Sequence, residues 1–404
     1  MRILIVKFAY PQYLAEYHRR HPQARRETYA EQKAAFDHDA FWWGDFWSHA
    51  LAPLGHEVTE IVMNDEPLQR AWARERGTRV ARLDWMLPIL RAQAADFRPD
   101  ALFIQSFRGL RYESLRRIQE GCPSIRRTVG WCGAPPVDRD EFRACDVVLS
   151  CVPEIVQQLS RLGHRAFHLH HAFDPRVLER LGPRSGESVE LSFVGNVTSQ
   201  DMYVDRVDLL RRIEREIPVR VHTFLGGGAA TRLAKTTAGK VVYPLSRALE
   251  RAGVGRAVLQ SLPVIGPAAT WSGSPRYRRA PVTRRNLRGP VFGLEMFRLL
   301  RDSKVTLNVH RAETHSASNL RMFEATGVGT CLLTDWKPNL SELFEVDREV
   351  VAYRSAEECV EKARWLLDHP AERKRIARAG QERALGEHTF AHRAPELDRV
   401  LRAG

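Results

Sequence analysis

No apolar run in the sequence approaches the roughly 20 residues that a membrane-spanning helix requires. The first apolar run, Ile3 to Val6, is followed at once by Lys7, which makes it too short for the core of a signal peptide. It is instead typical of a buried strand. We therefore expect a cytoplasmic protein, with any membrane contact made from the surface.

Cysteine is scarce, with six in 404 residues, and no two stand in a CxxC spacing. This pattern argues against a disulfide framework and favours reduced thiols in the core of a cytosolic protein. Three histidines, His168, His170 and His171, lie close together, but no cysteine spacing accompanies them as it would in a zinc site. We expect them to be structural.

Acidic residues are almost absent from residues 226–289, which contain twelve Lys or Arg and only Glu250. This segment therefore carries +11 of the total charge of +13 and leaves +2 for the remainder. Its basic residues interleave with apolar patches, a composition that suits contact with an anionic membrane surface. A solvated excursion is the alternative. Nucleic acid is not expected as a partner, because no nucleic-acid-reading motif accompanies the basic residues.

A chain of 404 residues with 44% hydrophobic residues is long enough for two folded domains. Apolar runs alternate with helical patterns along both halves, which predicts a parallel sheet with crossover helices in each. The expected strands are Ile3 to Val6, Glu57 to Val62, Ala101 to Ile104, Asp146 to Cys151, Val189 to Val194, Val219 to Leu225, Val305 to Val309, Thr330 to Leu333 and Val350 to Tyr353. We place the domains at 1–175 and 187–386, separated by a turn-rich linker.

The most informative stretch is residues 316–335, SASNLRMFEATGVGTCLLTD. Ser318 or Asn319 can cap a helix whose apolar stripe includes Phe323. Gly327 and Gly329 end the helix, and an apolar strand follows. The sequence therefore predicts a strand, helix, strand unit.

Arg321 falls in the first turn of this helix, where a cation opposes the positive end of the helix dipole at a cost of about 0.3 to 1 kcal/mol. An anion would offset that cost, and helix starts are natural sites for phosphate. Glu324 lies on the same face. Arginine on a diphosphate and glutamate on ribose hydroxyls would suit a nucleoside diphosphate. The alternative is an exposed ion pair between the two side chains.

Several motifs occur in order along the chain: FWWGDFWSHALAPLGHEV from Phe41, FVGN from Phe193, LNVHR from Leu307, NLRMFEATGVG from Asn319 and LLTDWKPNLSELFE from Leu332. With these motifs the chain resembles GT-B glycosyltransferases related to the spore maturation protein CgeB. The resemblance does not extend to residues of about 226–289, a basic insertion.

The resemblance implies an α/β GT-B fold of two facing Rossmann-like domains, with a terminal helix of about 387–404 crossing back to the first. It also implies a nucleotide-sugar donor site in the second domain and an acceptor site in the first. Such enzymes usually work without a metal, so we expect no metal or other cofactor.

The donor site implied by the resemblance and by the strand ends has seven residues. The backbone amides of Gly195 and Asn196, which follow the first strand of the second domain, would face the phosphate. The other five residues would contribute side chains. The alternative for Arg206 is a solvent-facing position on a helix. The alternative for His310 is a structural role. The seven residues are Gly195, Asn196, Arg206, His310, Asn319, Arg321 and Glu324.

Related retaining enzymes carry two glutamates, of which the second matches Glu324 and the first falls on Ser316. This departure weakens a retaining mechanism, and an inverting enzyme would need a base in the first domain. We choose Asp45, because partial burial among aromatic residues would raise its pKa. The alternative is a helix cap. Asp138 and Asp140 match a DxD motif, but they lie in the acceptor domain and we expect no metal there.

The sequence thus predicts a glycosyltransferase that uses a nucleoside diphosphate sugar. We expect a sugar, lipid-linked or glycan acceptor and a product in a bacterial surface polysaccharide or glycolipid. Two alternatives remain open. One is a scaffold that binds nucleotide sugars without catalysis, and the other is a nucleotide-sugar epimerase.

Overall fold

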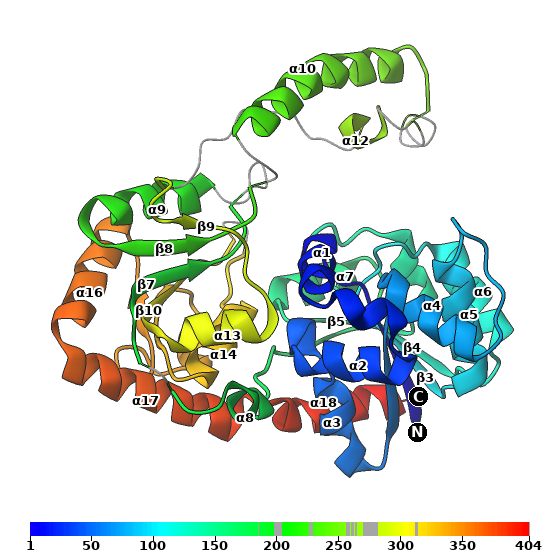
Figure 1. The fold of residues 1–404 in the computed structure, drawn as a ribbon, viewed down its shortest axis with the longest axis horizontal. Coiled ribbons are helices and arrows are strands. Elements are labelled where there is room, and N and C mark those ends of the chain that lie inside the picture. Colours follow the sequence, from blue (N-terminus) through cyan, green and yellow to red (C-terminus); the bar gives the residue numbers. More distant parts are fainter. Residues whose placement is uncertain are drawn as a thin grey trace.

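The protein has two α/β lobes joined side by side (Figure 1). The computed structural model describes residues 1–184, 186–197, 204–225, 229–255, 259, 262, 265–269, 282–311 and 314–403. Each lobe is built on a six-stranded sheet in which all paired strands are parallel. Two parallel sheets with crossover helices are the fold that the sequence predicts.

The first sheet has the strand order β2-β1-β3-β4-β5-β6. Its central strands are buried along nearly their whole length, as expected of a sheet covered on both faces. The strands are β1 (Arg2–Lys7), β2 (Glu57–Val62), β3 (Ala101–Ile104), β4 (Arg127–Trp131), β5 (Val147–Ser150) and β6 (Ala166–His168). The helices are α1 (Pro11–Arg20), α2 (Tyr29–His38), α3 (Phe46–Leu51), α4 (Glu66–Glu75), α5 (Met86–Phe97), α6 (Tyr112–Gly121) and α7 (Pro153–Arg161). Short 3₁₀ turns are η1 (Pro22–Arg26), η2 (Phe41–Trp43), η3 (Ala52–Leu54) and η4 (Asp140–Ala144).

The second sheet has the order β12-β11-β10-β7-β8-β9. Its strands are β7 (Val189–Val194), β8 (Val219–His222), β9 (Leu287–Arg288), β10 (Ser303–Asn308), β11 (Cys331–Asp335) and β12 (Val351–Tyr353). The helices of this half are α8 (Arg176–Leu181), α9 (Val204–Glu216), α10 (Ala229–Arg251), α12 (Gly266–Ala269), α13 (Gly293–Arg301), α14 (Leu320–Gly327), α15 (Leu340–Leu343), α16 (Ala356–Asp368), α17 (Pro370–Glu387) and α18 (Phe390–Arg402). The predicted boundaries at 175 and 187 fall between β6 and β7.

The end of the chain returns to the first lobe (Figure 1). Helix α17 runs along the second lobe, and α18 packs against α3. Phe390, at the start of α18, sits against the rings of Trp43, Phe46 and Trp47. His56 Nε2 lies 2.7 Å from Asp398 Oδ1. The predicted crossing helix is confirmed.

Strand β4 was not predicted, because Arg126, Arg127, Thr128 and Gly130 interrupt any apolar run. Burial of this strand is a tertiary effect. A Cβ atom on Gly130 would stand 2.9 Å from the ring of Phe107 and 3.0 Å from Cys145 Sγ, so the residue's small size lets neighbouring elements close over the strand.

The predicted insertion at 226–289 extends too far at its end, because Leu287 and Arg288 form β9 and pair with β8. The rest of the segment, where the structure describes it, contains α10 and α12, which pack on each other. Residues 226–228, 256–258, 260–261, 263–264 and 270–281 lie outside the described residues. In Figure 1 α10 projects away from both sheets.

No helix in the described part of the chain is long and apolar enough to cross a membrane. The six cysteines are free thiols, and all but Cys145 are buried. Burial raises the pKa of Cys331 to about 12, so this thiol stays protonated near neutral pH.

Candidate active site

The two lobes meet through loops that follow parallel strands at their carboxyl ends, the edge where α/β sheets bind ligands. The chain after β10, described at residues 309–311 and 314–319, reaches the start of α7, which follows β5. Ser316 Oγ donates a hydrogen bond to Glu154 Oε1 at 2.7 Å across this contact. We call the contact between residues 314–319 and the start of α7 the interdomain seam.

Helix α14 begins at the second-domain side of the seam, and Asn319 is its N-cap. The Asn319 side chain accepts from the backbone N–H of Arg321 at 3.4 Å and donates to Asn308 Oδ1 at 2.8 Å. Asn308 also donates to Thr334 Oγ1 at 3.0 Å. The helix start is therefore tied to the ends of β10 and β11, which confirms the predicted capping.

His310 fixes the loop that leads into α14. The backbone N–H of Ser318 donates to His310 Nε2 at 3.3 Å, so this nitrogen is the acceptor of a neutral ring. The other nitrogen, Nδ1, lies 2.7 Å from Asp335 Oδ1 and donates to it. Burial acts to raise the pKa of Asp335, but the hydrogen bonds that it accepts from the ring and the backbone of His310 lower it overall. The arrangement supports the alternative reading of His310 as a positioning residue.

Two further side chains hold the same loop, and the sequence patterns did not point to either. Asn339 accepts from the backbone N–H of Ala317 at 2.6 Å and donates to its carbonyl at 3.2 Å. Lys337 donates to the carbonyl of Thr314 at 2.7 Å. The signal available in the sequence was their place just after β11, alongside the end of β10 in the sheet.

Arg321 and Glu324 form an ion pair of 2.7 Å on the face of α14. Their side chains are only 15% and 12% exposed, so the alternative of a solvent-exposed pair is wrong. Burial raises the pKa of Glu324, and the charge of Arg321 acts in the opposite direction. The guanidinium also lies 2.9 Å from Met296 Sδ of α13. A mostly buried arginine at a helix start is an arrangement that suits an anion, and its predicted contact with a diphosphate stays a prediction.

Arg206 of α9 is buried, so the alternative of a solvent-facing side chain is also wrong. Its guanidinium donates to the carbonyl of Asn196 at 3.0 Å and to the carbonyl of Val309. The side chain therefore joins the loop after β7 to the loop after β10. Its predicted contact with the donor stays a prediction.

Gly195 does not offer the free amide that the sequence reading assigned to it. Its N–H donates to the carbonyl of His222 at 3.1 Å and so extends the pairing of β7 with β8. A free phosphate-facing amide at this position is wrong, because the ladder continues one residue beyond the strand. Asn196 is exposed just after it, and its predicted role stays a prediction.

Asp45 has a different environment from the one predicted. It lies 2.8 Å from Arg176 and 3.0 Å from Arg180, both on the interdomain helix α8. Burial acts to raise the pKa of Asp45, but the hydrogen bonds and charges of the two arginines outweigh it and lower the pKa. The predicted raised pKa is wrong. The geometry gives Asp45 the role of an anchor for α8, which opposes its assignment as the base.

The weaker sequence signals for metal have no support in the described residues, where no group of three His, Cys, Asp or Glu side chains is placed to hold an ion. Asp140 is exposed and faces Arg143 at 3.8 Å. His168 lies 3.2 Å from the carbonyl of Cys151. Burial lowers the pKa of His170 and of His171 to about 3, which keeps both rings neutral.

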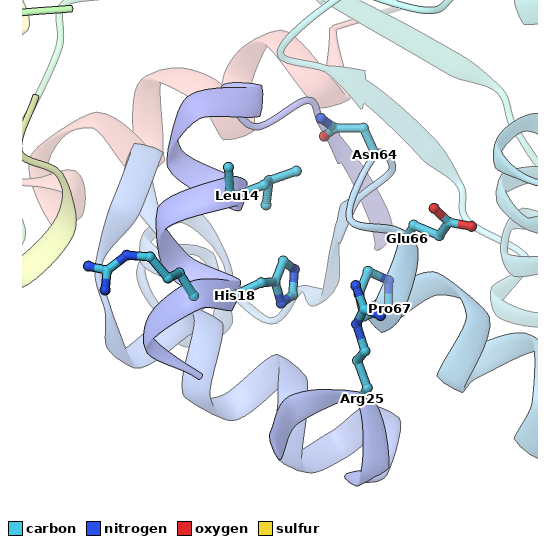
Figure 2. A pocket seen from close by; sticks show the side chains of 8 residues that line it. Leu14, His18, Arg25, Asn64, Glu66 and Pro67 are labelled. Carbon is cyan, nitrogen blue, oxygen red and sulfur yellow. The ribbon is translucent and has the colours of Figure 1, made fainter. Parts of the chain in front are cut away.

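A separate hollow of about 450 Å³ lies on the first domain between α1, η1 and the turn after β2 (Figure 2). In Figure 2 Leu14 and His18 of α1 face Asn64, Glu66 and Pro67, and Arg25 reaches over from η1. The lining residues are Leu14, Ala15, His18, Arg19, Arg25, Asn64, Glu66 and Pro67. None of them is a predicted donor residue.

Residues 243–399 match the family described as Glycosyl transferase-like. The matched residues make up less than half of the chain. No curated protein sequence matches.

Three solved structures resemble the chain over almost its whole length. HepE from Anabaena, in complex with UDP-glucose, has 10% identity and a TM-score of 0.53, with 100% of each chain covered. Sucrose-phosphate synthase from Thermosynechococcus elongatus has 11% identity and a TM-score of 0.52, covering 100% of this chain and 98% of that one. A glycosyltransferase from Rickettsia africae has 8% identity and a TM-score of 0.51, covering 99% and 97%. These likenesses show the fold, and the fold is GT-B.

Proposed function

We propose that the protein is a glycosyltransferase that moves a sugar from a nucleoside diphosphate sugar to an acceptor hydroxyl. The observation that carries the proposal is the desolvated Arg321–Glu324 pair at the capped start of α14, beside the interdomain seam. The family match over residues 243–399 includes this pair. HepE, which shares the fold, was solved with UDP-glucose and with UDP and glucose.

The chemistry requires negative charge to develop on the departing diphosphate, and the site must stabilise it. The start of α14 presents the positive end of a helix dipole, and Arg321 adds a full charge on the same turn. Arg321 would exchange part of its contact with Glu324 and Met296 for phosphate oxygens. Glu324 would then accept hydrogen bonds from ribose hydroxyls.

We further propose that transfer needs no metal ion, because Arg321 and the helix start supply the positive charge that a metal supplies in other transferases. The test is transfer after exhaustive treatment with EDTA, compared with transfer in added Mg²⁺ or Mn²⁺. Equal rates support the proposal. Loss of activity on chelation, restored by one of the ions, would refute it.

The product is proposed to be a bacterial surface polysaccharide or glycolipid, made by a cytoplasmic enzyme at the inner face of the membrane. Support comes from α10, which carries the exposed apolar side chains Leu233, Val241 and Leu245 beside the exposed cations Lys240 and Arg251. Apolar and basic side chains on one projecting helix suit an anionic lipid surface. Each basic residue contributes about 1 kcal/mol near such a surface.

The membrane part is tested by sedimentation with vesicles of phosphatidylglycerol and phosphatidylcholine. Replacing Lys240 and Arg251 by Gln removes about 2 kcal/mol, so binding should weaken roughly 30-fold. The matched control replaces two exposed basic residues of the other lobe, Arg74 and Arg117. Equal binding by the variant and the control would refute the proposal and favour a solvated excursion.

The donor is tested by thermal unfolding in the presence of UDP, GDP, TDP and CMP sugars. A ligand at 100 times its dissociation constant adds about 2.7 kcal/mol to native-state stability, which corresponds to a shift of several degrees. Transfer to an added glycolipid acceptor then identifies a transferase. Binding without turnover would favour the scaffold, and isomerised donor without an acceptor would favour the epimerase.

A further inference from the structure

Glu154 is a carboxylate of the interdomain seam that the predicted site does not include. It occupies the first turn of α7, directly after β5 and Pro153. Its Oε1 accepts the hydrogen bond of Ser316 Oγ from the second domain at 2.7 Å. Its Oε2 is buried and has no hydrogen-bond partner in the part of the chain that the structure describes.

Three other carboxylates of the site are already held by cations or by close hydrogen bonds. Asp45 is held by Arg176 and Arg180. Glu324 is paired with Arg321.

Asp335 is held as well. Its carboxylate accepts a hydrogen bond from His310 and lies 3.5 Å from the Lys337 ammonium. Among the described residues no Lys or Arg pairs with Glu154, so its second oxygen is not committed to a cation.

The start of α7 favours a charged carboxylate at this place. Pro153 begins the helix, and Glu154 stands in the first turn, where the helix dipole stabilises negative charge by about 0.3 to 1 kcal/mol. His168 lies near enough to interact with Glu154. Burial lowers the pKa of His168, and the charge of Glu154 acts more weakly in the opposite direction. A carboxylate with one committed oxygen and one uncommitted oxygen has the form of a general base.

We propose that Glu154, and not Asp45, is the general base of the transfer reaction. The inference rests on the proposed function. Glu154 Oε2 takes the proton of the acceptor hydroxyl as the acceptor oxygen forms its bond to the anomeric carbon. The bond from that carbon to the diphosphate oxygen breaks, and its electron pair leaves on the diphosphate beside Arg321. A single displacement of this kind inverts the configuration of the sugar.

Ser316 then acts as a positioning residue. Its hydroxyl comes from the loop that leads into α14, so it ties the base in one domain to the donor site in the other. The contact exists only when the two domains are together. Glu154 is therefore positioned beside the donor site only in that arrangement.

The first test is Glu154→Gln, which keeps an oxygen to accept the Ser316 hydrogen bond but cannot take up a proton. The donor is the nucleotide sugar that gives the largest thermal shift, and the acceptor probe is octyl glucoside. We expect kcat to fall about 10²- to 10⁴-fold, with donor affinity and melting temperature unchanged. The acidic limb of the pH–rate profile should also disappear.

The matched control is Ser316→Ala, which removes the positioning hydrogen bond and keeps the base. We expect a smaller loss of kcat, on the order of 10-fold, with the acidic limb retained. The anomeric configuration of the product, followed by NMR, gives a second readout, and inversion is expected.

Two results would overturn the inference while leaving the proposed function intact. One is a Glu154→Gln enzyme that transfers within about threefold of the wild type, and the other is a product of retained configuration. A wild-type protein that neither binds nor transfers any sugar of the panel would instead refute the proposed function, and this inference with it.

Discussion

Replacing Arg321 by Met removes the charge at the start of α14 and keeps most of the side-chain volume. Glu324 then loses its partner while only 12% exposed. Breaking a fully buried pair costs about 3 to 5 kcal/mol. Here the cost is smaller, because Glu324, whose pKa is already raised by burial, can take up a proton.

Removing a cation from a helix start also returns about 0.3 to 1 kcal/mol. We therefore expect a net loss of about 1 to 2 kcal/mol in the free energy of unfolding. The effect on the ligand should be larger. A hydrogen bond to a charged group is worth about 1.5 to 3 kcal/mol, so affinity for the nucleotide sugar should fall roughly 10- to 100-fold.

The assay combines chemical denaturation with titration calorimetry of the nucleotide sugar. The control is Arg348→Met, which breaks the Arg348–Glu345 pair of the same 2.7 Å length and the same sequence spacing, but 65% and 57% exposed. That change should cost no more than about 1 kcal/mol and leave binding unaltered. If Arg321→Met lost stability but bound the nucleotide sugar as tightly as the wild type, Arg321 would be structural and the reasoning about phosphate would fail.

Three further outcomes follow from the site. Burial holds the pKa of Glu324 above its ordinary value, so native stability should decline as the pH rises from the ordinary pKa of a glutamate to the raised pKa of Glu324. Glu324→Gln should flatten this decline in denaturant titrations. His171, with its pKa lowered to about 3, should destabilise the fold as pH falls from about 6.5, and His171→Gln should lessen that acid sensitivity in thermal scans. Asp45→Asn should cost about 1 to 2 kcal/mol through its lost contacts with Arg176 and Arg180, yet turnover per folded molecule should stay within a few-fold; abolished turnover would restore Asp45 as the base.

The strands and the α14 unit could be predicted because their signals are local. A buried parallel strand is an apolar run, and most such runs in this sequence are strands in the structure. The Asn319 cap and the positive φ of +79° at Gly329 involve neighbours only a few residues away. β4 escaped prediction because its burial depends on Phe107 and Cys145 closing over Gly130.

The roles of single side chains could be predicted less well. Gly195 lies after a strand as predicted, but the sequence does not show that its N–H is taken by His222 of the neighbouring strand. Asp45 stands among aromatic residues as predicted, and its pKa is nevertheless lowered, because two arginines from α8 reach it. In both cases the local sequence pattern was correct, but the residue that pairs with the predicted group is distant in the sequence.

The sequence by itself determined the two parallel sheets, the capped helix at 320–327 and the closeness of Arg321 to Glu324, because hydrophobic periodicity and helix geometry act over a few residues. Only the tertiary structure decided which charges are neutralised. Asp45 meets Arg176 across 131 positions, Arg206 meets Val309 across 103, and Ser316 meets Glu154 across 162. Folding sets such pairs by bringing loops of separate strands to one edge, and no spacing within a short segment encodes them.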